Sequence, residues 1–455
     1  MEYTRSKLLW KRSYILNNYS IFNKPTKIAI NAQIPQNSGN GGVESVLISL
    51  VSALGKLDDG LEEYVIIGPY DNPDWLQPFL GPNQILIRGE KTIESQERMG
   101  KKFLFRQYSR KLIKHFFNLF DLPQIDTQVP ISNGFFESTG CDLIHFPDQL
   151  FTICALPSVY NPHDLQHLHF PQFFTPRVIR WRETIYQAGC HYANTVVVGS
   201  QWIKDDLIEK YGLNSKKIQV IPWGPPTQII SNPTDEFKSI VKKKYSLPDS
   251  FAFYPAMLWE HKNHVRLLDA MAYLRDNKNL RINLVCSGNI KTDFWGIINQ
   301  HIQDLNLMSQ VQFLGMVSYE ELRALYQLSQ FVVIPTLFEA ASGPVFEAWF
   351  EQTPVACSSV TSLPEQASDA AFLINPISVE SIANSMFLLQ TEESVRNNLV
   401  VNGMKRLLDF NWNRTAKAYR AVYRKTVNKK LSEEDNKLLH WDWMRYPDKY
   451  NEENL

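Results

Sequence analysis

Two glutamates, Glu339 and Glu347, lie eight positions apart in a segment whose other residues are small or apolar. The segment follows an apolar run at 331–335 and opens a helix pattern near residue 345. N–H groups at a helix start attract anions, and small residues let a ligand approach the backbone. We expect this approach at Ala340, Ala341, Ser342 and Gly343.

The chemistry of the two glutamates favours a polyhydroxylated ligand. A carboxylate only accepts hydrogen bonds, so the pair would bind sugar hydroxyl groups better than phosphate oxygens. A structural interpretation fits the spacing equally well, with one glutamate capping a helix and the other in a buried ion pair. Spacing alone leaves both interpretations open.

Lys262 is a candidate for neutralising a bound anion. It lies in the segment 259–264, just after an apolar run at 252–255 that predicts a strand. A lysine at this place is also compatible with a solvated helix start. Its combination with the two glutamates favours a binding site.

His163 and Asp164 form a third candidate pair, in a segment with further histidines at 167 and 169. Three histidines suggest zinc, but prolines at both ends of the segment disrupt helical spacing and no H-E-x-x-H pattern is present. We therefore expect no metal, and expect His167 and His169 to pack or to line an acceptor loop.

Glycines at strand ends are weaker candidates. Gly41 and Gly42 lie between a strand pattern at 27–31 and a helix pattern at 43–54. A glycine loop in this context suits a phosphate, although many such loops are tight turns. A second strand end, at 283–288, carries Ser287 and Gly288.

The elements that position these residues alternate between strand and helix along the chain. One series runs from 27 to 221 and another from 252 to 374, on either side of the Pro-Trp-Gly-Pro-Pro segment 222–226. This alternation predicts an α/β protein of two tandem Rossmann-like doubly wound domains, with a cleft between them. The predicted parts are domains 1–222 and 227–427 and an aromatic C-terminal tail, 428–455.

Composition limits the function classes. The chain of 455 residues has 47 Lys plus Arg and 47 Asp plus Glu, so no overall basic field attracts nucleic acid. Its five cysteines form no C-x-x-C pair and suit a reduced, cytoplasmic protein. No apolar run approaches the roughly 20 residues of a membrane span. The segment 98–117 is basic and amphipathic, which fits either an anionic membrane surface or a solvated helix face.

The spacing of Glu339 and Glu347, in the second of two Rossmann-like halves, resembles the retaining glycosyltransferases of family 4, which have the GT-B fold. The resemblance covers most of residues 27–425. It implies that Glu339 contacts donor-sugar hydroxyls and that Glu347 holds the nucleotide ribose. It also implies that Lys262 neutralises the donor diphosphate.

Other segments match the family more loosely. His163 and Asp164 resemble its His-Asp pair at the reaction centre. The glycine loop resembles one that closes over the donor phosphates, and the strand end at 287–288 lies where the nucleotide binds. Glu365 ends a Leu-Pro-Glu segment and either touches the nucleotide or caps a helix. Met257 departs from the pattern, because the family commonly has an arginine there; Arg266 is a substitute candidate.

The resemblance implies a retaining hexosyltransferase that moves a sugar from a nucleoside-diphosphate sugar to a glycan or lipid-linked acceptor, in polysaccharide or glycolipid biosynthesis. No cofactor is expected, and the absence of Asp-x-Asp predicts metal independence. The expected location is cytoplasmic or peripheral on the inner membrane face. Alternatives are a non-catalytic nucleotide- or sugar-binding protein and a nucleotide-sugar hydrolase or epimerase. No G-x-G-x-x-G follows the first strand, which excludes a dinucleotide oxidoreductase.

Overall fold

The structure is a computed structural model that describes residues 25–35, 42–91, 128–225, 232–290, 293–441 and 443. The chain divides into two compact units. The first contains the residues up to 162, with 180–196 and 416–439. The second contains 163–179, 197–415 and the residues from 440 onward. The predicted boundaries at residues 222 and 427 stay predictions.

A seven-stranded parallel sheet lies mostly in the first unit, in the order β3-β2-β1-β4-β5-β6-β7. Its central strands are buried on both faces, as parallel sheets require. The strands are β1 (Thr26–Asn31), β2 (Glu62–Gly68), β3 (Gln84–Arg88), β4 (Leu143–Phe146), β5 (Ser158–Tyr160), β6 (Thr195–Val198) and β7 (Ile218–Val220).

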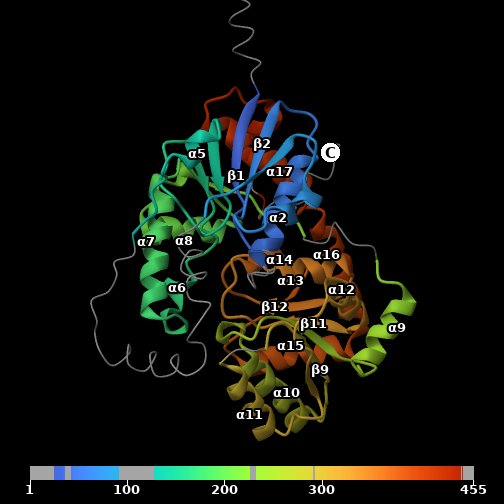
Figure 1. Ribbon diagram of the computed structural model, residues 1–455. Coiled ribbons are helices and arrows are strands. Elements are labelled where there is room, and N and C mark those ends of the chain that lie inside the picture. The colour runs from blue at the N-terminus through green and yellow to red at the C-terminus, as the bar shows by residue number, and fades with distance from the viewer. Residues whose placement is uncertain are drawn as a thin grey trace, which may run out of the picture. The chain divides into compact units, whose positions relative to one another are not determined.

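Helices connect these strands (Figure 1). They are α2 (Gly42–Gly55), α5 (Phe135–Ser138), α6 (Gln166–His169), α7 (Pro176–Tyr192) and α8 (Gln201–Tyr211), with short 3-10 turns η1 (Asp74–Phe79), η2 (Pro171–Phe173) and η3 (Ser215–Lys217). Helix α8 begins where the sequence predicts it, because the Ser200 hydroxyl accepts a hydrogen bond from the Ile203 N–H.

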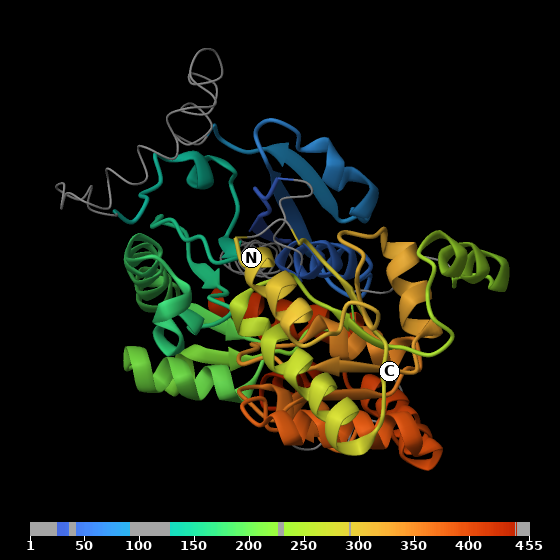
Figure 2. The same cartoon turned by 90° about the horizontal axis from the view of Figure 1, so that it is seen from below.

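The second unit contains a six-stranded parallel sheet in the order β10-β9-β8-β11-β12-β13. Figure 2 shows its strands with helices on both sides. The strands are β8 (Ala252–Pro255), β9 (Leu284–Ser287), β10 (Val311–Phe313), β11 (Phe331–Ile334), β12 (Val355–Ser358) and β13 (Phe372–Ile374). The predicted fold class, α/β with two Rossmann-like doubly wound sheets, is confirmed. The cleft between them stays a prediction.

The remaining helices complete the chain. They are α9 (Asp235–Lys244), η4 (Glu260–Lys262), α10 (His264–Lys278), α11 (Trp295–Asp304), α12 (Tyr319–Leu328), α13 (Gly343–Phe350), α14 (Leu363–Ala367), α15 (Val379–Thr391), α16 (Glu393–Leu407), α17 (Trp412–Thr426) and α18 (Glu433–Leu439). In the predicted tail, Trp443 is buried under the Arg414 guanidinium, whose carbon lies 5.7 Å from the ring centroid.

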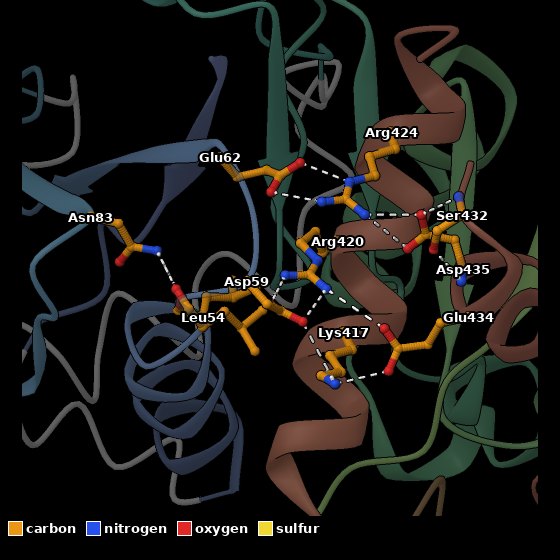
Figure 3. A network of polar contacts seen from close by, with 11 residues as sticks. Leu54, Asp59, Glu62, Asn83, Lys417, Arg420, Arg424, Ser432, Glu434 and Asp435 are labelled. Carbon is orange, nitrogen blue, oxygen red and sulfur yellow. Dashed lines mark hydrogen bonds and ion pairs between the residues drawn. The ribbon is translucent and has the colours of Figure 1, made fainter. Parts of the chain in front are cut away.

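Most of α17 belongs to the first unit, although it lies near the end of the chain. Its Arg420 forms an ion pair with Asp59 (Figure 3). Arg424 donates to both oxygens of Glu62, at 2.7 and 3.0 Å, and to Asp435 of α18 at 2.9 Å. Bidentate arginine–carboxylate pairs of this kind fix geometry as well as charge. They tie α17 and α18 to the β2 side of the first unit.

Candidate functional site

The candidate residues of the second unit gather at the point where its strand order reverses. Strands β8 and β11 are parallel neighbours, and the chain leaves them in opposite directions across the sheet. Lys262 follows β8 and Glu339 follows β11. In open α/β sheets ligands bind outside the carboxyl ends of the strands at such a switch point.

Lys262 and Glu339 are in direct contact. The lysine Nζ lies 2.5 Å from Glu339 Oε1, and the two side chains are only 17% and 13% exposed. A partly buried ion pair is desolvated, so each charge depends on the other. The structure thus brings together one cation and one carboxylate beyond the carboxyl ends of β8 and β11, where ligands of such sheets bind.

The backbone around Lys262 is held from three sides. The Tyr254 hydroxyl donates to the Lys262 carbonyl at 2.7 Å. Asn263 adopts a left-handed conformation, with φ 63°, and its amide nitrogen donates to the Pro335 and Pro376 carbonyls at 2.8 Å each. The loops after β8 and β11 are therefore locked together, which positions the lysine.

Glu339 is held by hydroxyl groups of the next loop. The Thr361 and Ser362 hydroxyls donate to the Glu339 carbonyl oxygen at 2.6 and 2.7 Å. The Glu339 N–H in turn donates to Thr361 Oγ1 at 3.2 Å. These bonds fix the Glu339 backbone and so position its side chain beside Lys262.

The start of α13 has the features of an anion site. The Ser342 N–H donates to Gln366 Oε1 and its carbonyl accepts from Gln366 Nε2, both at 2.8 Å. The Ser342 hydroxyl is buried and has no hydrogen-bond partner among the described residues. Gly343 and Pro344 open the helix, where proline costs no hydrogen bond. A buried hydroxyl without a partner at a helix start suits a ligand oxygen.

Glu347 lies on α13, and its side chain contacts the neighbouring helix α12. The Tyr326 hydroxyl donates to Glu347 Oε2 at 2.7 Å. Burial raises the pKa of the Glu347 carboxyl, the hydrogen bond from Tyr326 lowers it, and the nearby Glu351 carboxylate raises it further. The net shift is upward, so this carboxylate would gain from donors such as ribose hydroxyls.

Ser287 and Gly288 end β9, beside β8. Gly288 has φ 131°, and a Cβ built there would lie 2.3 Å from the Ala256 carbonyl oxygen. No other residue fits this close approach of two loops. At Met257, where the resemblance leads us to expect arginine, the thioether sulfur accepts from the Asn289 N–H at 3.4 Å.

The proposed substitute cation, Arg266, lies in the first turn of α10. Its guanidinium donates to Asn263 Oδ1 at 3.0 Å, next in the chain to Lys262. The structure therefore places a second cation near the loop, although its role toward a ligand stays a prediction.

His163 and Asp164 also belong to the second unit. His163 is buried in a left-handed conformation, φ 66°, with its ring 5.3 Å from that of Trp223. Asp164 Oδ1 accepts from the Gln166 N–H at 3.0 Å and so shapes the loop. A non-glycine residue held at positive φ is strained, which is typical of functional loops.

Two other predicted residues have structural partners. His169 Nε2 lies 2.8 Å from Asp206 Oδ1, and its ring lies 5.5 Å from that of Phe338, next to Glu339. Glu365 Oε2 accepts from the Gln201 N–H at 2.9 Å, at the start of α8. Glu365 therefore caps a helix here, and its contact with a nucleotide stays a prediction.

Other candidates lie in the first unit or outside the described residues. Gly42 begins α2 in the first unit, with open space where a Cβ would point, and its contact with a donor stays a prediction. Gly41 and the basic segment 98–117 lie outside the described residues. Within the part of the chain that the structure describes, no helix has the length and apolarity to cross a membrane. No group of three potential metal ligands occurs there either.

Sequence reasoning missed the residues that support the site. Tyr326, Gln366 and Tyr254 each fix a predicted residue by one hydrogen bond or two, and Asn263 accepts a hydrogen bond from the candidate Arg266. The apolar periodicity of 320–328 could have placed Tyr326 on the buried face of its helix. Which side chains of separate helices and loops form hydrogen bonds with one another leaves no comparable pattern in the sequence.

Two family profiles match the chain in consecutive segments. The profile described as "Glycosyltransferase Family 4" matches residues 40–228. The profile described as "Glycosyl transferases group 1" matches residues 236–406, which contain Lys262, Glu339 and Glu347.

Curated relatives match at low identity. The O-antigen chain mannosyltransferase B of Escherichia coli is 23% identical over 253 residues, which are 55% of this chain and 65% of that protein. The O-antigen chain mannosyltransferase RfbU of Salmonella typhimurium is 28% identical over 215 residues, 47% of this chain and 55% of that protein. The chain thus spans less than two thirds of the length of these relatives.

Solved structures show the same fold. The Anabaena protein Alr3699/HepE, in complex with UDP and glucose, superposes with a TM-score of 0.61 at 15% identity, over 88% of this chain and all of that one. At this identity the likeness concerns the fold alone.

Proposed function

The chain belongs to glycosyltransferase family 4, with the GT-B fold, and on that premise we propose that it transfers a sugar from a nucleoside-diphosphate sugar to a glycan or lipid-linked acceptor. The observation that supports this most is the contact of Lys262 with Glu339 beside the start of α13. A cation, a carboxylate and a helix N-terminus are the three groups that a sugar diphosphate needs. In the proposed complex the ligand separates the pair.

Each group would act on a different part of the donor. The bond between the sugar C1 and the diphosphate oxygen breaks, and its electrons leave with the phosphate. Lys262 and the N–H groups of Ala340, Ala341 and Gly343 would stabilise that charge, each well-placed donor contributing roughly 10²–10³ in rate. The Ser342 N–H is already bonded to Gln366, so Ser342 would contribute its hydroxyl instead. Glu339 would accept from sugar hydroxyls and Glu347 from ribose hydroxyls. The acceptor hydroxyl oxygen bonds to C1, and its proton passes to the departing diphosphate or to water, so that glycoside and nucleoside diphosphate are the products.

His163 and Asp164 are proposed to lie at the reaction centre. The strained backbone of His163 supports this, since strain is stored at functional loops. Gly41, Gly42, Ser287, Gly288 and Glu365 are proposed to contact the donor.

Retention of anomeric configuration and metal independence are further proposals. Retention is tested by following the product anomeric proton by NMR during turnover. Metal independence predicts an unchanged rate in EDTA. A product of inverted configuration, or a rate abolished by EDTA and restored by Mg²⁺ or Mn²⁺, would overturn the respective proposal.

The names of the relatives suggest the substrates. Two are mannosyltransferases of O-antigen chains, and the Anabaena structure contains UDP and glucose. We extend to this chain a hexose donor and a role in polysaccharide or glycolipid biosynthesis. A peripheral location at an anionic membrane, through segment 98–117, is tested by liposome sedimentation. The triple variant Lys101→Glu, Lys102→Glu and Arg106→Glu should no longer sediment with anionic liposomes.

Thermal shift with UDP, GDP and ADP tests the donor site in wild type and Glu347→Ala. Stabilisation by one diphosphate, lost in the variant, would support the site and name the base. The absence of any shift would reject the nucleotide-sugar proposal. A non-catalytic binding protein remains the second candidate, favoured by Met257. It predicts diphosphate binding without any transfer to acceptors, whereas a hydrolase releases free sugar.

A further inference from the structure

A polar cavity of about 590 Å³ lies in the second unit, at the amino ends of the strands. The site described above lies at their carboxyl ends. Gln330 and Pro354 line this cavity and come immediately before β11 and β12. Lys262 and Glu339, by contrast, follow the strands β8 and β11. Because the strands are parallel, the cavity lies at their amino ends and the candidate site at their carboxyl ends, a strand length away. The cavity is therefore a separate feature.

Carboxamides are the most frequent side chains in the lining of the cavity, although those of Asn232, Gln327 and Gln330 already hydrogen-bond within the protein. A carboxamide both donates and accepts hydrogen bonds, as sugar hydroxyl groups do. The amides of Gln352 and Asn397 are exposed and make no hydrogen bond to any other described residue. The lining includes five such residues: Asn232, Gln327, Gln330, Gln352 and Asn397.

An aromatic ring lies beside these amides. Phe350 lines the cavity and is 36% exposed, which is unusual for phenylalanine. The Arg323 guanidinium carbon lies 5.2 Å from the ring centroid and holds the ring from one side. An immobilised, partly exposed ring offers its surface to the C–H face of a pyranose.

Among the described residues, the one carboxylate in the lining, Glu351, is already paired within the protein. Arg323 Nε lies 2.5 Å from Glu351 Oε1, and Gln327 Nε2 donates to Glu351 Oε2 at 2.6 Å. Both members of the ion pair are almost fully buried. Arg396 donates to the Leu389 carbonyl at 2.9 Å. Arg396 keeps its charge, because carbonyls are neutral partners. The preference for an uncharged ligand therefore rests on the exposed amides of Gln352 and Asn397.

We propose that this cavity is a second carbohydrate site, which binds a neutral oligosaccharide. Its volume falls within the range of small-molecule sites, roughly 300–1,000 Å³. The amides of Gln352 and Asn397 bind hydroxyl groups and Phe350 stacks on a ring. The site is independent of nucleotide binding and would hold a glycan chain whether or not the protein transfers sugar.

The test is titration calorimetry with α-mannotetraose, maltotetraose and tetragalacturonate on the full chain. A neutral tetrasaccharide should bind saturably, and tetragalacturonate should not. Phe350→Ala, and the double variant Gln352→Ala with Asn397→Ala, should each weaken binding roughly tenfold. The double variant changes exposed side chains only, so it tests the site even if Phe350→Ala is unstable.

Two variants serve as controls. Asn398→Ala changes the neighbouring exposed residue of α16, which does not line the cavity, and should bind normally. Glu347→Ala should also bind the oligosaccharide normally while losing the diphosphate. The proposal is overturned if neither neutral tetrasaccharide binds, if the cavity variants bind as wild type, or if Glu347→Ala alone abolishes binding.

Discussion

The Tyr326 hydroxyl donates a 2.7 Å hydrogen bond to Oε2 of Glu347, from a residue that is itself 1% exposed. This bond opposes the rise in the Glu347 pKa that burial causes. Removal of the hydroxyl in Tyr326→Phe should therefore raise that pKa further and misorient the carboxylate. We expect affinity for the nucleoside diphosphate to fall roughly 10- to 150-fold, as for loss of a hydrogen bond to a charged group.

Calorimetric titration between about pH 5 and about pH 8 measures this effect. Ionised Glu347 accepts the ligand hydroxyls, so affinity should decline on acidification, and the decline should begin at higher pH in Tyr326→Phe. Tyr64→Phe is the control, because that buried hydroxyl has no partner among the described residues. An identical pH profile in wild type and Tyr326→Phe would contradict the proposed role.

Lys262→Met should remove the cation that faces the leaving phosphate. The expected loss is roughly 10²–10³ in kcat. The variant should also be less stable, because Glu339 loses its partner in a partly buried place. Steady-state kinetics at saturating donor measure the first effect and thermal unfolding the second. Lys243→Met, at an exposed lysine of α9, should leave both unchanged; an active Lys262→Met enzyme would contradict the assignment.

Ser342→Ala tests whether the Ser342 hydroxyl binds a ligand or only stabilises the fold. The Ser342 hydroxyl is buried without a partner among the described residues, so its removal should raise the free energy of unfolding, by about 1–3 kcal/mol at most. Affinity for the diphosphate should fall roughly fivefold. Ser385→Ala should show the reverse, since that hydroxyl donates to the Ile382 carbonyl at 2.7 Å. Unaltered affinity in Ser342→Ala would remove this hydroxyl from the site.

Asp148 should make stability depend on pH. Burial raises the pKa of its carboxyl from 3.8 to about 7. A carboxyl with a raised folded-state pKa favours folding below its unfolded pKa, and this contribution is lost as pH rises toward 7. Asp148→Asn should be more stable than wild type near pH 8, by at most about 4 kcal/mol, and this gain should vanish near pH 4. Denaturant unfolding at several pH values measures this, with the exposed Asp71→Asn as control; a gain that is the same at every pH would contradict it.

Arg424→Ala should strongly destabilise the first unit. It leaves Glu62 and Asp435, with side chains 6% and 1% exposed, without their cation. Breaking a buried pair from one side costs about 3–5 kcal/mol. Urea unfolding of Arg424→Ala and of the neighbouring exposed Lys425→Ala tests this. Equal stability of the two variants would show that the network contributes little.

The sequence predicts the sheet well where a strand is buried on both faces. The run Phe331–Ile334 is apolar throughout and was assigned correctly, and Ser200 marks the start of α8 because its hydroxyl caps the helix. Strand β5 has only three residues and follows a proline, so no pattern reveals it. Its pairing with β4 and β6 defines it instead.

The site was predictable residue by residue but not in its contacts. Glu339, Glu347 and Lys262 have side chains that suit a sugar diphosphate, and strand order explains why the first and the last are neighbours. The pairing of Glu347 with Tyr326 depends on how α12 packs against α13, which a single sequence does not encode locally. The partners of Arg420 and Arg424 are separated from them by 361 and 362 positions.

That separation has a consequence for biosynthesis. A ribosome adds about 5–20 residues per second, so roughly 20–70 s pass between the synthesis of Glu62 and that of Arg424. Throughout this interval Tyr64 lacks the ring of Tyr423 beside it, and the two nascent acids lack their guanidinium partners. The first unit to be translated is thus completed only when residues 416–439 emerge, and a ribosome that stalls before them releases a chain that chaperones and proteases would recognise as unfinished.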